Sequence, residues 1–177
     1  SNYLINVNDG GVNVSYDGGA SWRDFHAHHP LIQFYNIAYD MDKPFRVYGS
    51  VQDHGTYRCV VTHRPTREDR MGSRVSGWES CPGGEGTHIA VDPTDSGLVY
   101  SSSFYGRLMR SELKNDKWES KDVYPKPGPN EPPHRGQWLA PTILSPHNPS
   151  IVYHGFQYLF RSLDRGQTWE RISPDLT

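Results

Sequence analysis

The stretch Ser162-Leu163-Asp164-Arg165-Gly166-Gln167-Thr168-Trp169 has a second copy near the other end of the chain, Ser15-Tyr16-Asp17-Gly18-Gly19-Ala20-Ser21-Trp22. Both copies fit the pattern S-x-D-x-G-x-S/T-W. The pattern predicts a tight turn between two strands, in which Ser and Asp oxygens accept hydrogen bonds from backbone amides, Gly takes a positive φ, and Trp packs beneath the turn. We therefore expect a structural role for Ser15, Asp17, Gly19, Trp22, Ser162, Asp164, Gly166 and Trp169.

A second repeat extends the pattern over the whole chain. The pairs Val47-Tyr48, Val99-Tyr100 and Val152-Tyr153 recur at intervals of 52 and 53 residues. Each pair follows a short apolar strand and a turn rich in Asp, Pro, Asn or Ser, and precedes a third strand and a fourth that carries a tryptophan. No segment has helical periodicity. Units of about 50 residues with four short strands are typical of β-propeller blades.

The sequence therefore predicts an all-β fold, a β-propeller segment of about three and a half to four four-stranded antiparallel blades. The expected blades are 3–25, which is partial, then 34–81, 87–121 and 140–173. Closed propellers need at least four blades and usually more. We expect the chain to be part of a larger ring, completed by further blades of a longer protein or by a second copy, and its start inside strand-like sequence favours a piece of something longer.

Two units depart from the turn pattern. In the third unit Ser111 and Trp118 keep the seven-residue separation of the two intact turns, which indicates a weakened copy in the same register. In the second unit the charged segment Thr62–Arg74 replaces the turn. We interpret this segment as a solvated loop or, alternatively, as a patch for an anionic ligand or a protein partner.

Composition excludes some classes of partner. The 177 residues carry a formal net charge of −2, which argues against the broad basic surface that nucleic acid or an anionic membrane requires. No apolar run is long enough to span a membrane, and the N-terminus lacks the basic and apolar regions of a signal peptide. Cys59 and Cys81 are expected in neighbouring strands, where both one disulfide and two separate buried thiols are open alternatives.

The alternation of strands predicts a candidate site. Loops between the second and third strands, and loops that enter each blade, should meet at the end opposite the Ser-x-Asp turns, near the propeller axis. Carboxylates and aromatic rings in these loops are typical of carbohydrate binding and cleavage. We predict Asp53 and Glu85 as a possible catalytic pair. The predicted ligand-binding residues are Asp9, Gln52, His54, Tyr105, Arg135, Gln137, Trp138 and Gln157.

Simpler interpretations stay open for several of these residues. Turn capping alone would explain Asp9 and Asp53. Glu85 lies among glycines, which is also typical of a plain flexible loop. For Trp138, packing in the core or between blades is favoured over a platform for a sugar ring. The segment His26-Ala27-His28-His29 is better interpreted as solvated histidines than as a metal site, and we predict neither a metal nor a cofactor.

Some enzyme classes find little support. The chain has no G-x-S-x-G motif and no cysteine with a clear histidine partner. Sialidase chemistry needs three arginines around a carboxylate, and only Arg135, with Arg107 near it, is expected on the favoured face. Sialidase activity is therefore not predicted.

The repeated turn resembles the Asp-box, or BNR repeat, of sialidases, sortilin-like receptor ectodomains and tandem-propeller xyloglucan-cleaving hydrolases. The segments VYGSVQDHGTYR (47–58), QWLAPTILSPHNPSIVYHG (137–155) and LFRSLDRGQTWERISPDLT (159–177) resemble large bacterial proteins described as BNR-repeat or sortilin-like glycosyl hydrolases. The resemblance implies a propeller that is secreted, periplasmic or at the cell surface. His54 departs from the related pattern, which commonly has Asn there. In the tandem-propeller hydrolases the acid pair lies in a cleft between two propellers, of which this chain would supply only part.

Three functional hypotheses follow. The first is a module that binds a glycan or a peptide at the axial face. The second is a glycoside hydrolase in which Asp53 and Glu85 lie about 5–5.5 Å apart for retention or about 6.5–9.5 Å apart for inversion. The third is an assembly or receptor module that uses an exposed blade edge or the Thr62–Arg74 segment to contact another protein.

Overall fold

The computed structural model describes residues 2–8, 11–24, 33–61 and 77–177. Asp9, the histidines of 26–29 and the charged segment 62–74 lie outside the described residues, so the predictions made for them are not tested here. The chain divides into two compact units, Ser1–Ile32 and Gln33–Thr177, and each is described by itself.

The first unit is one antiparallel sheet. Its strands pair in the order β1 (Leu4–Asn8), β2 (Gly11–Ser15) and β3 (Arg23–Asp24). The C-terminal copy of the repeated turn lies between β14 and β15 of the second unit, just as the N-terminal copy connects β2 to β3.

The second unit contains three four-stranded antiparallel sheets, each built from strands in chain order. Sheet B comprises β4 (Phe34–Tyr39), β5 (Arg46–Val51), β6 (Gly55–Val60) and β7 (Glu79–Cys81). Sheet C comprises β8 (Ile89–Asp92), β9 (Asp95–Ser102), β10 (Leu108–Lys114) and β11 (Lys117–Asp122). Sheet D comprises β12 (Thr142–Leu144), β13 (Val152–Gly155), β14 (Leu159–Ser162) and β15 (Glu170–Arg171).

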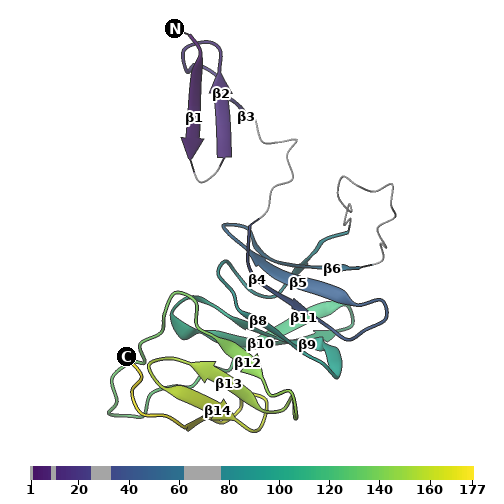
Figure 1. Cartoon of the computed structure of the whole chain (residues 1–177), viewed down its shortest axis with the longest axis vertical. Helices are drawn as coiled ribbons and strands as arrows, with labels where there is room; N and C mark the ends of the chain where they lie inside the picture. Colours follow the sequence, from purple (N-terminus) through teal and green to yellow (C-terminus); the bar gives the residue numbers. More distant parts are fainter. Residues whose placement is uncertain (1, 9–10, 25–32, 62–76) are drawn as a thin grey trace. The chain divides into compact units, whose positions relative to one another are not determined.

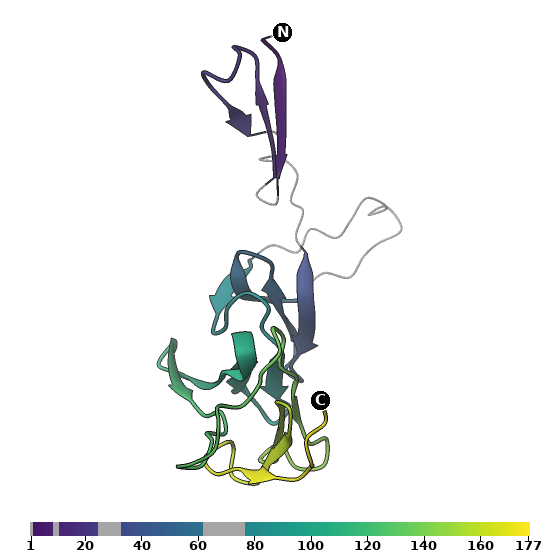
Figure 2. The same ribbon diagram turned by 90° about the vertical axis from the view of Figure 1, so that its left-hand side faces the viewer.

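Successive sheets of the second unit contact one another through their first strands. Strand β4 contacts β8, and β8 contacts β12 (Figures 1 and 2). Four-stranded antiparallel sheets that follow one another in this way are the blades of a β-propeller. The predicted all-β fold and propeller segment are therefore confirmed. Within the described residues the helical structure is a single 3₁₀ turn, η1 (Phe104–Gly106), and no helix there has the length and apolarity needed to cross a membrane.

The Val-Tyr repeat builds the apolar contact between sheets. On β5, Tyr48 is fully buried and packs in one cluster with Ile89, Val91 and Val99 of sheet C. On β9 the equivalent residue is Tyr100, which is also fully buried. Its cluster contains Leu98, Leu108, Val123 and Val152, so it reaches sheet D. The tyrosine of each pair thus packs toward the next sheet, and the valines Val99 and Val152 pack in the same clusters as the tyrosine of the preceding sheet.

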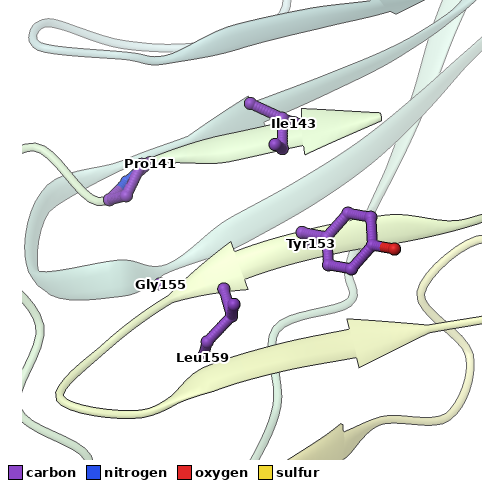
Figure 3. Close-up of a pocket in the computed structure, with 5 residues that line it drawn as sticks. All are labelled: Pro141, Ile143, Tyr153, Gly155 and Leu159. Atoms are coloured by element: carbon purple, nitrogen blue, oxygen red, sulfur yellow. The ribbon is translucent and has the colours of Figure 1, made fainter. Parts of the chain in front are cut away.

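Sheet D repeats this surface, and it is the last sheet of the second unit. Tyr153 occupies the position of Tyr48 and Tyr100 but is only half-buried. With Pro141, Ile143, Gly155 and Leu159 it lines an apolar pocket of about 420 Å³ (Figure 3). We call these five residues the open face of sheet D.

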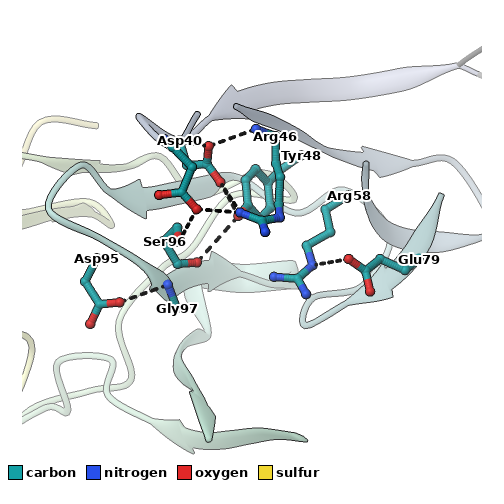
Figure 4. A network of polar contacts seen from close by, with 9 residues as sticks. Asp40, Arg46, Tyr48, Arg58, Glu79, Asp95, Ser96 and Gly97 are labelled. Atoms are coloured by element: carbon teal, nitrogen blue, oxygen red, sulfur yellow. Dashed lines mark hydrogen bonds and ion pairs between the residues drawn. The ribbon is translucent and has the colours of Figure 1, made fainter. Parts of the chain in front are cut away.

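A buried carboxylate supports the contact between sheets B and C (Figure 4). Asp40 is 1% exposed and accepts hydrogen bonds from the Arg46 backbone N–H at 2.8 Å and the Tyr48 hydroxyl at 3.0 Å. Burial, together with Asp40, raises the pKa of Tyr48. The Ser96 hydroxyl of sheet C donates to Asp42 at 2.8 Å and lowers the pKa of that carboxyl. The bond to Asp40 thus fixes the Tyr48 hydroxyl, and the bond from Ser96 to Asp42 connects sheet C to sheet B.

The N-terminal copy of the repeated turn has the predicted hydrogen bonds. The Ser15 hydroxyl oxygen accepts from the Gly19 amide at 2.8 Å, and an Asp17 oxygen accepts from the Ser21 amide at 2.9 Å. The Ser21 hydroxyl also donates to Asp17, and these bonds lower the pKa of Asp17 to about 2. Gly19 has φ 97°, and a Cβ at this position would lie 3.8 Å from the Trp22 ring.

The C-terminal copy is built in the same way. The Ser162 hydroxyl oxygen accepts from the Gly166 amide and an Asp164 oxygen accepts from the Thr168 amide, each at 2.8 Å. Gly166 has φ 83° and lies over the ring of Trp169. All of these bonds are local, so eight residues are sufficient to specify the turn.

In the third unit the predicted register holds for Ser111, which lies opposite Val99 as Ser162 lies opposite Val152, but is wrong for Trp118. Ser111 pairs with Ser120, and their hydroxyl oxygens lie 2.7 Å apart. Trp118 lies two residues nearer the turn, so its seven-residue separation from Ser111 does not repeat the geometry of the intact copies. The hairpin turns at Asn115 and Asp116, which both have positive φ. Two consecutive residues with positive φ form a two-residue hairpin turn. Strands β10 and β11 therefore stay paired up to Lys114 and Lys117, beyond the point where the strands of the intact copies separate.

The two cysteines lie on neighbouring strands, as expected, and both are free buried thiols. Cys81 pairs with Thr56, three residues from Cys59 on the same strand. At about 3.3 Å per residue this offset is roughly 10 Å, beyond the reach of a disulfide. Burial raises the pKa of both thiols, to about 12 for Cys81.

His154 connects sheets C and D inside the protein. It is fully buried on β13, and its Nε2–H donates to the Gly106 carbonyl at 2.8 Å. The other ring nitrogen, Nδ1, then accepts from the Thr142 hydroxyl at 2.8 Å. Burial lowers the pKa of His154 to about 4. The imidazole is therefore neutral at pH 7.

We predict that acid destabilises the fold through His154. In the unfolded state His154 has the ordinary histidine pKa near 6.5, so it becomes protonated at a higher pH than in the folded state. The free energy of unfolding therefore falls as pH drops from about 6.5 to about 4. The loss is roughly 3 kcal/mol for a shift of this size. Burial lowers the pKa of His88 and His134 too, so they add to the slope with the same sign.

Urea unfolding at several pH values across this window measures the effect. His154→Gln should be less stable at neutral pH but should have a flatter pH dependence, whereas His147→Gln, at an exposed position, should follow the wild type. Equal slopes for wild type and His154→Gln would contradict the prediction.

Candidate functional site

Five loops of the second unit lie at one end of sheets B, C and D. They are 52–54, 82–88, 103–107, 123–141 and 156–158, which enter a sheet or connect its second strand to its third. In an antiparallel meander these connections share one end, opposite the repeated turn. The residues discussed below as the loop face are Tyr35, Asp53, Glu85, Tyr105, Gln137 and Trp138.

Tyr35 connects the two predicted carboxylates. It lies near the start of β4, and its hydroxyl donates to Glu85 at 3.4 Å, a long hydrogen bond. Partial burial raises the pKa of Tyr35, and the negative charges of Glu85 and Asp53 raise it further. Both carboxylates therefore act on the same phenol, although they come from different loops. Whether they form a catalytic pair stays a prediction.

The glycines around Glu85 hold the loop in a defined position. The Gly84 carbonyl accepts hydrogen bonds from the hydroxyls of Ser50 and Thr56, both at 3.2 Å. Gly83 has φ 134°, and a Cβ there would lie 2.5 Å from the Thr56 hydroxyl oxygen. The alternative of a plain flexible loop does not describe this segment, because strands β5 and β6 fix its backbone.

Three aromatic rings form the other half of the loop face. Phe104 packs against Trp138 with ring centroids 4.0 Å apart, and Tyr105 meets Trp138 edge-on at 5.9 Å. Tyr105 and Trp138 are still 64% and 44% exposed. Trp138 therefore packs against Phe104 and still has accessible surface, and its role in ligand binding stays a prediction. A Cβ on Gly86 would crowd Phe104, so glycine lets this cluster approach Glu85.

Two residues of the loop face have strained backbones. Asp53 and Tyr105 have φ 60° and 59°, a region that residues other than glycine rarely adopt. The Tyr105 amide donates to the Gln137 carbonyl at 3.1 Å, which holds the conformation. At Asp53 the turn is closed by His54, whose ring Nδ1–H donates to the Gln52 carbonyl at 2.8 Å. His54 and Gln52 thus support the turn that presents Asp53.

The structure changes the interpretation of Gln157. Gln157 is only 3% exposed, and its side-chain amide oxygen accepts a hydrogen bond from the Arg135 backbone N–H at 2.8 Å. We expected this side chain to bind ligand, but it satisfies the backbone instead. The Arg135 guanidinium donates twice to Asp175, at 2.8 and 3.0 Å, and to Thr177. The sequence did not indicate that the C-terminal residues pair with this arginine.

Metal binding has no support within the described ranges. Among residues 2–8, 11–24, 33–61 and 77–177 no three His, Cys, Asp or Glu side chains gather as ligands. The arrangement instead offers exposed rings beside carboxylates. Such a surface can stack against sugar rings or hold basic and amide groups of a peptide.

Comparison with known proteins gives distant structural likenesses. No protein-family model matches the sequence, and no curated protein does. YCF48 bound to a D1 peptide is 15% identical with a TM-score of 0.49, over 97% of this chain and 50% of that one. YCF48 from Cyanidioschyzon merolae is 11% identical with a TM-score of 0.48, over 97% and 56%. The GH74 xyloglucanase from Xanthomonas campestris is 17% identical with a TM-score of 0.45, over 98% and 28%.

The chain thus spans about half of the first two structures and less of the third. We draw no functional argument from likenesses at this level.

We predict that Gly136→Ala disrupts the loop face. A Cβ on Gly136 would lie 2.1 Å from the Tyr105 carbonyl oxygen, so one of the two loops must move. We expect a loss of about 1–3 kcal/mol in the free energy of unfolding and a changed tryptophan environment near Trp138. Urea unfolding and near-ultraviolet circular dichroism measure the two effects. Gly84→Ala is the matched control, because nothing lies within 4 Å of its Cβ position. Equal stability of the two variants would contradict this account.

Proposed function

We propose that this chain is a propeller binding module whose loop face holds a glycan or a peptide. One observation carries the proposal: exposed Trp138, which Tyr105 meets edge-on, lies against Gly86 in the loop of Glu85, although these residues come from different parts of the second unit. Rings that the fold leaves exposed, on strained and tightly fixed loops, favour a ligand site over simple packing.

The wider assignment is also part of the proposal. The two repeated turns and the segments around them support an Asp-box, BNR-type and sortilin-like protein. Such a protein would be secreted, periplasmic or at the cell surface. Fold alone does not define activity, so these assignments add context to the site and do not replace its chemistry.

A glycoside hydrolase is the second candidate. The specific observation in its favour is that the Tyr35 hydroxyl donates to Glu85 at 3.4 Å and that the charge of Asp53 also raises the pKa of this phenol. Two carboxylates near one another are what acid and base, or acid and nucleophile, roles require. In this reading the aromatic rings position the sugar and the two acids cleave the bond.

Binding and turnover assays separate the two candidates. We expect the wild-type chain to bind members of a glycan array or a peptide library. Trp138→Ala should lower the affinity about tenfold or more, because it removes the aromatic ring on which the ligand would stack. Leu163→Ala, an exposed apolar position in the repeated turn, is the control. Turnover of a bound glycan that Glu85→Gln abolishes would favour the hydrolase, and unchanged affinity in Trp138→Ala would refute the site.

The open face of sheet D supports a proposal about assembly. On sheets B and C the equivalent face packs against the next sheet of the chain. We therefore propose that a further blade of the same kind packs against the open face of sheet D. For the 177-residue chain studied alone, a second copy is the source.

Analytical ultracentrifugation tests this assembly. The chain should self-associate with rising concentration, and Ile143→Asp should weaken association because a carboxylate replaces an exposed apolar side chain at the contact. Leu163→Asp, at an exposed apolar position of the repeated turn outside this face, tests whether the effect is specific. A monomer at all concentrations would contradict it.

A further inference from the structure

The fold itself uses a recurring combination to hold arginines. Arg58 lies over the Trp118 ring at 5.0 Å, and its guanidinium pairs with Glu79 at 3.0 Å. Arg171 lies over the Tyr158 ring at 4.6 Å and pairs with a glutamate as well, Glu131 at 3.5 Å. In both places an aromatic face and a carboxylate together bind one guanidinium, through cation–π attraction and an ion pair.

The loop face presents the same two groups. Trp138 and Tyr105 supply exposed aromatic surface, and Glu85 supplies a carboxylate on the neighbouring loop. Within the described part of the chain, Glu85 accepts a long hydrogen bond from the neutral hydroxyl of Tyr35. A neutral donor at 3.4 Å leaves the charge of this carboxylate largely uncompensated.

The arginines of the adjacent loops do not compensate it. Arg135 is held by Asp175 through two hydrogen bonds. Arg107 is held by Asp122 at 3.0 Å. Among the described residues, the charges of Glu85 and Asp53 act on Tyr35, whose pKa they raise in addition to the effect of partial burial.

From these contacts we propose that the loop face recognises a peptide partner through a basic side chain, arginine or lysine, held between the carboxylate of Glu85 and the rings of Trp138 and Tyr105. The inference rests on the proposed binding function and specifies its ligand. It also excludes acidic ligands, because Glu85 and Asp53 repel them.

A pair of matched peptides tests the charge requirement. The probes are acetylated and amidated Gly-Arg-Gly and the same tripeptide with citrulline, which keeps the shape of arginine but is neutral. Tryptophan fluorescence and heteronuclear NMR titrations measure binding to the whole chain. We expect the arginine peptide to bind about tenfold tighter than the citrulline peptide, and the difference to shrink as salt is raised.

Two variants assign the effect to residues. Glu85→Gln should remove the preference for arginine over citrulline, and Trp138→Leu should weaken both peptides. Glu119→Gln removes an equal charge from an exposed position on β11 and should leave the preference intact. Thermal unfolding of each variant shows whether it is folded before its affinity is compared.

The outcomes distinguish this inference from the proposed function. Equal binding of both peptides, lost in Trp138→Leu, would overturn the charge requirement and keep the binding module. Binding of neutral glycans with no preference for either peptide would likewise overturn it in favour of a sugar ligand. If neither peptides nor glycans bind the folded wild type, the proposed function itself fails.

Discussion

Burial of one tyrosine between each sheet and the next is the interaction on which the second unit depends. Tyr48 and Tyr100 are fully buried, and each reaches apolar side chains of the following sheet. The Tyr48 hydroxyl donates to Asp40 at 3.0 Å, whereas the buried Tyr100 hydroxyl has no hydrogen-bond partner among the described residues. Asp92 occupies the same place in sheet C and is approached by Arg165 of sheet D at 3.7 Å. The two contacts between sheets thus share a plan but differ in their polar partners.

This stacking determines where chemistry can occur. Because the first strands of consecutive sheets contact one another, the loops at their entry are brought together as well. Gly86 and Gly136 allow backbone and rings from neighbouring loops to approach more closely than any side chain would permit. The buried imidazole of His154 adds a further connection, since it binds the Gly106 carbonyl next to Tyr105. The loops of the loop face are therefore attached by hydrogen bonds to the same sheets that stack.

The character of the loop face follows from which charges are paired. Arg135 and Arg107 each have an aspartate partner, whereas Glu85 meets only a neutral phenol among its described contacts. The exposed rings beside it are apolar surface that the fold does not use. The same rings and carboxylates would serve to stack a sugar, to bind a positively charged group or to cleave a sugar. Which of these functions applies depends on the ligand.

The sequence alone determined the all-β class, the propeller units and the repeated turn, because these are specified locally. The bonds from Ser162 and Asp164 reach amides no more than four residues away, so their pattern is readable as letters. The sequence-based prediction misplaced Trp118. A shorter turn at Asn115 shifts the strand pairing, although Ser111 and Trp118 keep the same separation in sequence as the intact copies. Only the tertiary structure joined Tyr35 to Glu85 and Arg135 to Asp175, pairs that are 50 and 40 residues apart. Contacts of that kind depend on how sheets stack and where loops end, and no periodicity in the chain encodes them.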